Sequence, residues 1–216
     1  MKSLLRTSVF LAVSVIALAP LHAQGIYFGV RGGAGIPVGS FSENTSTGGS
    51  STALLDAAKS GFGYGLDAGL QMGMIGVYGG FDRIKFDCES ASCNTDGKYR
   101  LQGLAVGLKL VPPGLSGIRP WIKGGVTFNE LEGGYGNGQN DLKTDRKPGY
   151  EVGAGLDIPI FGLLSFTPQA RYVGQNFNYK VPGVTSTTTD NQGVNYLTFD
   201  LGLSVHNPLA GLHRQR

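Results

Sequence analysis

Side chains at every second position alternate between apolar and small or charged through most of this chain. This pattern constrains the fold more than any other feature of the sequence. In the segment 149–160 (GYEVGAGLDIPI), every even-numbered residue is apolar, and every odd-numbered one is glycine, acidic or proline. A period of two belongs to a β-strand, because successive side chains of a strand point to opposite faces. The same alternation occurs in segments 25–38, 61–72, 74–87, 98–111, 118–131, 164–179 and 194–207. The sequence therefore predicts eight strands.

The connections between these strands alternate in length. Short connections fall at 72–74, 112–117 and 161–163, and long polar ones at 39–60, 88–97, 132–148 and 180–193. Each predicted strand reaches the ~9–11 residues that a tilted strand needs to cross a bilayer. Short turns at one end and long loops at the other are typical of outer-membrane barrels. We therefore predict an all-β fold, an eight-stranded antiparallel transmembrane β-barrel.

The alternation is interrupted in two of the segments. In 74–87 the pattern slips at Arg83–Ile84, and in 164–179 the pattern is lost after Tyr172. Such a slip predicts either a β-bulge or the end of the membrane-embedded part of the strand.

Composition excludes several other classes of protein. The 36 glycines follow no Gly-X-Y period, so a collagen-like fold is excluded. Apolar residues make up 41% of the chain, which argues against disorder. A formal net charge of +3 gives no indication of a nucleic-acid partner.

The N-terminus reads as an export signal. Lys2 and Arg6 precede an apolar run at 8–19, and Ala23 offers a cleavage site. The alternative is a short buried helix. We expect residues 1–23 to be a signal peptide, 24–207 the barrel, and 208–216 a short basic periplasmic tail.

The two faces of the strands differ in chemistry, which indicates how the barrel is oriented. The apolar face suits lipid, and the face of glycines and charges suits the lumen. A soluble barrel of the lipocalin kind would place the apolar face inside.

The predicted lumen charges are Arg31, Lys109, Arg119, Lys123 and Arg171 against Asp67, Asp82, Glu151, Asp157 and Asp200. Because charges withdrawn from water need partners, this balance predicts an ion-pair network that plugs the lumen. The alternative is a narrow passive porin-like channel.

Cys88 and Cys93 are the only two cysteines, and they lie in one predicted long loop. In an exported protein this spacing predicts a disulfide. A metal site is the weaker interpretation, since no histidine or second cysteine pair accompanies them.

Catalysis of the Ser–His kind has one candidate pair. Ser204 and His206 share a strand face, because residues two positions apart in a strand point to the same side. The strand ends at the periplasmic side, out of reach of the outer leaflet, so we predict no enzyme, no cofactor and no metal site.

Several segments resemble the OmpA/OmpX-like superfamily of small outer-membrane barrels, and more closely its bacterial "outer membrane protein beta-barrel domain" members. They are YFGVRGGAGIPVG (27–39), PWIKGGVTFN (120–129), GYEVGAGLDIPI (149–160), LSFTPQARYV (164–173) and YLTFDLGLSV (196–205). The chain departs from that family at its last strand. This strand ends at Val205, His206 and Asn207 rather than on an aromatic residue.

The resemblance implies a location and a set of partners. We expect the mature chain in the outer membrane of a Gram-negative cell, as a monomer surrounded by outer-membrane lipid and lipopolysaccharide. It implies delivery by periplasmic chaperones and the outer-membrane assembly machinery. No peptidoglycan-binding domain follows in this sequence, so a wall anchor is not indicated.

Overall fold

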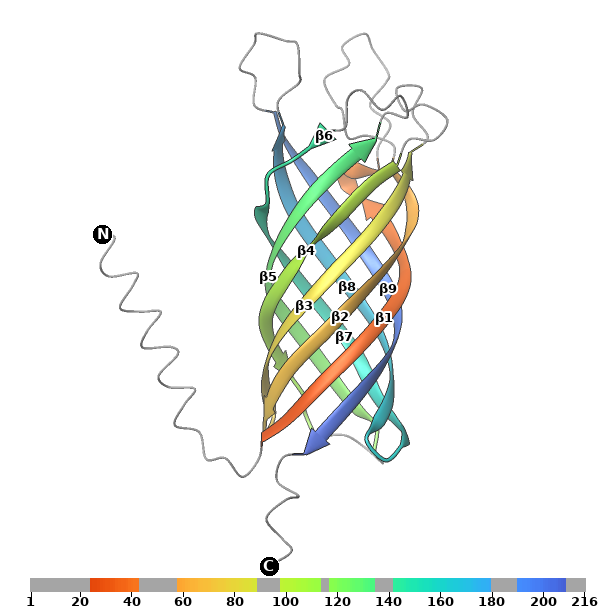
Figure 1. Ribbon diagram of the computed structural model, residues 1–216, viewed down its shortest axis with the longest axis vertical. Helices are drawn as coiled ribbons and strands as arrows, with labels where there is room; N and C mark the ends of the chain where they lie inside the picture. Colours follow the sequence, from red (N-terminus) through yellow and green to blue (C-terminus); the bar gives the residue numbers. More distant parts are fainter. Residues whose placement is uncertain are drawn as a thin grey trace, which may run out of the picture.

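A computed structural model shows a closed antiparallel barrel (Figure 1), and it describes residues 24–42, 58–88, 98–113, 117–134, 142–179 and 190–208. Eight long strands form the wall. They are β1 (Gln24–Val38), β2 (Ala58–Met72), β3 (Ile75–Cys88), β4 (Lys98–Leu110), β5 (Arg119–Gly134), β7 (Lys147–Phe161), β8 (Leu164–Tyr179) and β9 (Asp190–Pro208). A two-residue strand, β6 (Leu142–Lys143), pairs with β5, and a 3₁₀ turn, η2 (Gly39–Phe41), follows β1. The predicted eight-stranded barrel is confirmed.

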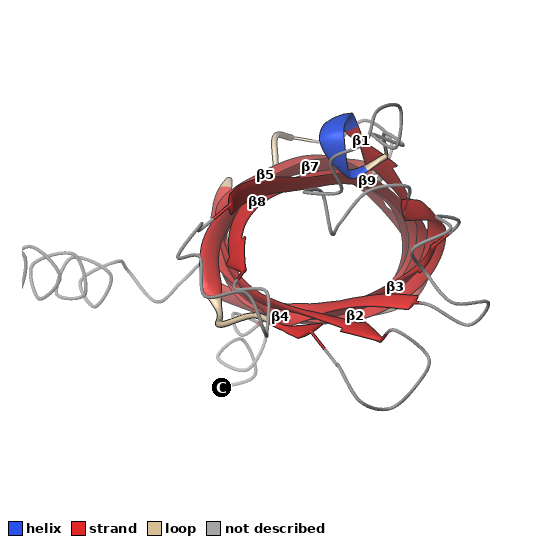
Figure 2. Cartoon of the chain, turned by 90° about the horizontal axis from the view of Figure 1, so that it is seen from above, coloured by secondary structure: helices blue, strands red, loops and turns tan. Residues whose placement is uncertain are grey.

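Every strand of the wall pairs with two neighbours, and this closes the ring seen from above in Figure 2. Consecutive strands pair antiparallel, and β9 closes the barrel against β1, for example at Gly25 opposite Pro208. Closure gives the backbone N–H and C=O groups partners within the wall, which a strand in lipid requires.

Short turns occupy one end of the barrel, which we call the turn end. Gly73 has φ +62° and Gly162 has φ +48°. These glycines connect β2 to β3 and β7 to β8, and a left-handed backbone favours glycine at both places. β1 begins and β9 ends at the same end. We call the opposite end the loop end.

Several strands extend further toward the loop end than the alternation predicts, and β5 ends at Gly134 rather than at 131. β2 begins at Ala58, β7 at Lys147 and β9 at Asp190. Backbone pairing causes the extension, since Tyr179 still pairs with Asp190 where the side chains no longer alternate. The hydrogen-bond ladder depends on the main chain, so it outlasts the side-chain pattern.

The outside of the barrel is apolar and the inside is polar over most of its height. Phe28 on the outer face is 62% exposed, whereas Glu151 on the inner face is 1% exposed. This arrangement suits lipid outside, and it overturns the alternative of a soluble barrel with an apolar interior. In the part of the chain that the structure describes, no helix has the length and apolar character needed to cross a membrane.

Of the two interpretations of the slip at Arg83–Ile84, a bulge is wrong. β3 and β4 pair in unbroken register from Ile75 opposite Leu110 to Asp87 opposite Lys98. The side chains keep alternating, but their chemistry is exchanged: Ile84 and Phe86 are buried inside, and Lys85 is exposed. The sequence pattern slipped because the two faces swap polarity. Register shifts occur instead between Ala58 and Gly61 and between Pro159 and Phe161.

Three of the predictions fall on residues that the structure does not describe. The signal peptide at 1–23, the tail at 209–216 and Cys93 all lie outside the described ranges. Cys88 is the last residue of β3, opposite Ala58 of β2. The disulfide and the cleavage therefore stay predictions.

Candidate functional site: the lumen

Arg171 on β8 is at the centre of the ion pairs that cross the lumen. Its Nη1 and Nη2 each donate to a carboxylate oxygen of Asp82 at 3.0 Å. Nη1 also donates to Glu151 at 3.1 Å, and Nε donates to Asp200 at 3.1 Å. One guanidinium therefore joins three strands, β3, β7 and β9, to β8. A guanidinium suits this task because its donors are held in a rigid planar fork.

Arg31 and Lys123 extend this group on the other side of the lumen. Arg31 Nη2 lies 2.8 Å from both oxygens of Asp82, and Arg31 also pairs with Asp67. Lys123 Nζ lies 3.6 Å from Asp67 and 3.9 Å from Glu151. We call these residues the central network: Arg31, Asp67, Asp82, Lys123, Glu151, Arg171 and Asp200.

Neutral side chains provide further hydrogen bonds to the central network. The hydroxyl of Tyr78 donates to Glu151 at 2.5 Å, and that of Thr198 donates to Asp200 at 3.0 Å. The central network holds three cations and four carboxylates. The balance of five positive and five negative lumen residues that the sequence predicts is therefore not reached within the central network alone. Hydrogen bonds to the buried carboxylates supply the remaining stabilisation.

A second group of charges lies nearer the turn end. Lys109 Nζ is 3.3 Å from Asp157, which also accepts hydrogen bonds from Trp121 Nε1 at 3.1 Å and from Thr167. The ammonium of Lys109 lies 4.5 Å from the centre of the Trp121 ring and 4.7 Å from that of Tyr27. Lys109 is therefore held by one carboxylate and two aromatic faces.

Glycines on the inner face make room for the large lumen side chains. A Cβ atom at Gly69 would lie 2.5 Å from the ring of Tyr27, and one at Gly125 would lie 2.6 Å from the Tyr78 hydroxyl. Real side-chain atoms do not approach so closely, so these positions exclude any larger residue. The glycine-rich face and the large aromatic residues thus fill one interior together.

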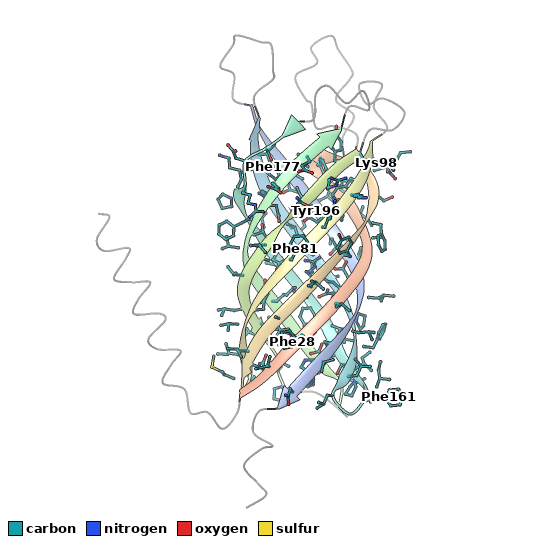
Figure 3. The ribbon with its side chains drawn as sticks, viewed as in Figure 1. Phe28, Phe81, Lys98, Phe161, Phe177 and Tyr196 are labelled. Carbon is teal, nitrogen blue, oxygen red and sulfur yellow. The ribbon has the colours of Figure 1, made fainter. Side chains whose placement is uncertain are left out.

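The loop end of the lumen is filled by apolar side chains, which we call the apolar outer cluster. Its members are Phe41, Ala58, Ile84, Phe86, Tyr99, Leu101, Leu131, Val173, Phe177, Val194 and Tyr196. Phe41 comes from η2 rather than from the wall, and its ring meets Phe86 edge-on with centroids 5.3 Å apart. Phe177 and Tyr196 lie in the upper part of the barrel in Figure 3, whereas Phe161 lies at the turn end. The side-chain alternation gave no prediction of this cluster.

The family comparison agrees with this architecture. The outer membrane protein beta-barrel domain matches residues 8–206, which is most of the chain. The chain belongs to this family. It is therefore a protein of the outer membrane, built as a small β-barrel.

Solved structures of other outer-membrane barrels share the fold. Neisserial surface protein A (NspA) matches with a TM-score of 0.53 and 13% identity, over 84% of this chain and 95% of that one. OprG from Pseudomonas aeruginosa matches with a TM-score of 0.53 and 12% identity, over 85% and 95%. No curated protein sequence matches the chain. At these identities the likeness concerns the fold alone.

The structure brings nine of the ten predicted lumen charges into ion pairs with one another. Arg119 is the tenth. It lies opposite Asp157 in the β5–β7 register, but it takes part in no ion pair among the described residues. Its half-exposed position near the turn end gives it access to solvent.

The Ser204 and His206 side chains have separate partners in the lumen. Ser204 Oγ lies 2.9 Å from Thr167 Oγ1, and His206 Nε2 lies 3.4 Å from Asp157. The His206 ring also stacks on Tyr27 with centroids 5.7 Å apart. A general base must be within hydrogen-bond reach of its nucleophile, and this pair shows no such bond in the described part of the chain.

Sequence reasoning missed the residues of the apolar outer cluster, although the signal was present. At the loop end, the inward positions of β3 carry Ile84 and Phe86, and those of β8 carry Val173 and Phe177. These are the places where the alternation was interrupted. Where the apolar residues of a strand move from its outward to its inward positions while the period of two continues, such a cluster can be identified.

Proposed function

We propose that this protein is a sealed, non-enzymatic barrel that presents its long connections on the cell surface. The observation that carries the proposal is a lumen occupied at three successive levels. Lys109 and Trp121 occupy the turn end, the central network occupies the middle, and the apolar outer cluster occupies the loop end. An eight-stranded barrel is just wide enough for its own side chains to fill.

The cavity between the two charged levels supports a closed state. It is lined by residues that include Tyr27, Arg31, Lys109 and Trp121, and its volume is about 30 Å³. A cavity of this size has room for about two or three water molecules. A hydrated ion is larger, so conduction would require side chains of the network to separate.

Conductance distinguishes the sealed barrel from a passive channel. We expect the refolded full-length protein to give no reproducible single-channel steps in a planar bilayer. A porin run in the same bilayer serves as the positive control, and heat-modifiable gel migration checks that the protein is folded. Regular steps from the folded protein would establish a channel and overturn the proposal.

Surface exposure of the loop end is tested by labelling. Ser42 lies at the loop end and Met74 in a short turn, and both are exposed. A membrane-impermeant maleimide should label Ser42→Cys on intact cells and Met74→Cys only after the outer membrane is permeabilised. The unsubstituted protein is the control for label on Cys88 and Cys93. Labelling of Met74→Cys on intact cells would reverse the orientation.

A further inference from the structure

An apolar groove runs across the outer face of β1 to β4 and continues onto Leu203 and Val205 of β9 and Leu164 of β8. Its upper row is formed by Leu66, Phe81 and Leu104, which lie opposite one another in register. In the row below, Ala68 and Gly79 form a shallow floor between larger neighbours, and the groove has a volume of about 740 Å³. The groove faces the hydrocarbon of the bilayer, since Phe28, Leu104 and Val106 on its rim are exposed on the apolar face.

Two cations lie directly beyond this groove on β3. Arg83 is the next outward residue after Phe81, and Lys85 follows it. Two residues of a strand advance about 7 Å, so the first cation lies one side chain above the groove. Figure 3 shows Phe28, Phe81 and Lys98 at increasing heights, which places the charged end of β3 and β4 on the loop-end side.

The neighbouring side chains leave these cations available to a ligand. Arg83 lies between Tyr64 and Gln102, and Lys85 lies between Phe62 and Arg100. Arg100 pairs with Glu132 at 3.2 Å, whereas neither Arg83 nor Lys85 takes part in an ion pair among the described residues.

The carboxylates of β3 do not pair with Arg83 or Lys85. The nearest outward carboxylate on the same strand is Asp87, which lies opposite Lys98, whereas Asp82 beside Arg83 pairs with Arg31 and Arg171 inside the lumen. Arg83 Nε is buried and has no hydrogen-bond partner in the described part of the chain.

Outward positions of other strands carry uncharged residues. The outward residues Tyr150, Tyr172 and Leu197 of β7, β8 and β9 are uncharged, as is Ala34 of β1. On the wall formed by β3 and β4, the apolar groove lies directly below two cations that take part in no ion pair among the described residues. The charge lies where the apolar band ends, which is the level of lipid headgroups.

We propose that this wall binds a phosphorylated acyl lipid of the outer leaflet, namely the lipid A part of lipopolysaccharide. An acyl chain lies in the groove over Gly79, and a headgroup phosphate lies on Arg83 and Lys85. The charge complementarity and the position at the loop end select this occupant. The site is on the outer wall, so it goes beyond the sealed lumen and does not depend on it.

Lipid retention by the full-length barrel tests the phosphate contact. Native mass spectrometry of the detergent-solubilised protein, titrated with lipid A, gives the bound fraction. We expect the Arg83→Gln, Lys85→Gln double variant to bind lipid A about tenfold more weakly, since each basic residue near a membrane surface contributes severalfold. The variant and the wild type should bind dephosphorylated lipid A equally.

The matched control removes two cations from another part of the same rim. Arg146→Gln with Lys147→Gln changes the net charge equally, on the β7 side of the barrel, and should leave lipid A binding unchanged. Equal weakening by both double variants would show a general charge effect and overturn the site. Unchanged binding by the Arg83, Lys85 variant would also overturn it.

A groove variant tests the acyl chain separately. Gly79→Leu fills the floor, where a Cβ has room because the nearest atom would be 3.9 Å away. We expect it to weaken binding of both phosphorylated and dephosphorylated lipid A. Gly124→Leu, at an outward glycine outside the groove, is the control and should have no effect. Equally tight binding of phosphatidylglycerol would overturn the choice of lipid A.

Discussion

The middle and the loop end of the lumen close the same barrel with opposite chemistry. In the middle, charged side chains such as Arg171 and Glu151 fill the interior, and Phe81 and Leu104 face outward. At the loop end, Phe86 is buried inside and Lys85 is exposed outside. The two faces of β3 therefore exchange roles between Phe81 and Arg83.

The surroundings of the wall explain this exchange. Within the bilayer the outer face must be apolar, so polar side chains are directed inward. Beyond the apolar band the outer face meets headgroups and water, and burial inside the barrel becomes favourable for apolar side chains. The loop end is thus organised like a water-soluble barrel. This agrees with the second interpretation of the sequence slip, the end of the membrane-embedded part of the strand.

The two regions should also respond differently to substitution. A buried ion pair that loses one partner leaves an uncompensated charge, whereas an apolar cluster that loses volume is destabilised in proportion to the cavity. The quantity that compares the two regions is the free energy of unfolding, measured in urea with the barrel refolded into phospholipid vesicles.

Arg171→Met should have the largest effect. It leaves Asp82, Glu151 and Asp200 without the guanidinium that joins them, and we expect a loss of about 3–5 kcal/mol. A loss of free energy smaller than that caused by Phe177→Ala would contradict the difference between the two regions.

Phe177→Ala should destabilise the loop end by about 3 kcal/mol, since its ring is fully buried in the apolar outer cluster. Phe177→Leu conserves most of the volume and should cost less than about 1.5 kcal/mol. The graded response is the signature of packing. Equal losses in the two variants would show that the ring has a role other than filling space.

Tyr78→Phe should have a smaller effect in the central network. The substitution keeps the ring and removes the hydroxyl that donates to Glu151, and we expect a loss of about 1–2 kcal/mol. Combined with Arg171→Met, the effects should not add, because both residues bind the same carboxylate. Strict additivity would show that Tyr78 stabilises the barrel independently of the network.

Arg119→Gln should have the smallest effect of the four, within about 0.5 kcal/mol. Arg119 is half-exposed and lies outside the ion pairs of the described residues. It also serves as the control for Arg171→Met, since both substitutions remove one arginine of the predicted lumen set. A loss as large as that of Arg171→Met would place Arg119 within the network.

Most of the wall could be predicted from the sequence, residue by residue. The alternation identified all eight strands, and Tyr150 outside with Glu151 inside follows directly from the period of two. A bulge at Arg83 was wrong. In the sequence of a single strand, a change of the apolar side from one face to the other looks the same as a shift in register. Pairing with β4, which is continuous there, distinguishes the two.

The partners within the lumen could not be read in the same way. Arg171 and Asp82 are 89 residues apart, and Arg31 and Asp82 are 51 apart. Which side chains meet across the lumen depends on the tilt and stagger of the closed barrel, and no single strand carries that information. The same holds for Phe41, which reaches the apolar outer cluster from a turn beyond β1.

The sequence by itself determined the number of strands, their faces and the polar character of most of the lumen, because side-chain direction in a strand is a local property. The tertiary structure decided which charges pair, where the interior becomes apolar, and that Arg83 lies above the groove over Gly79. These features require neighbouring strands in a fixed register, and only closure of the barrel provides it.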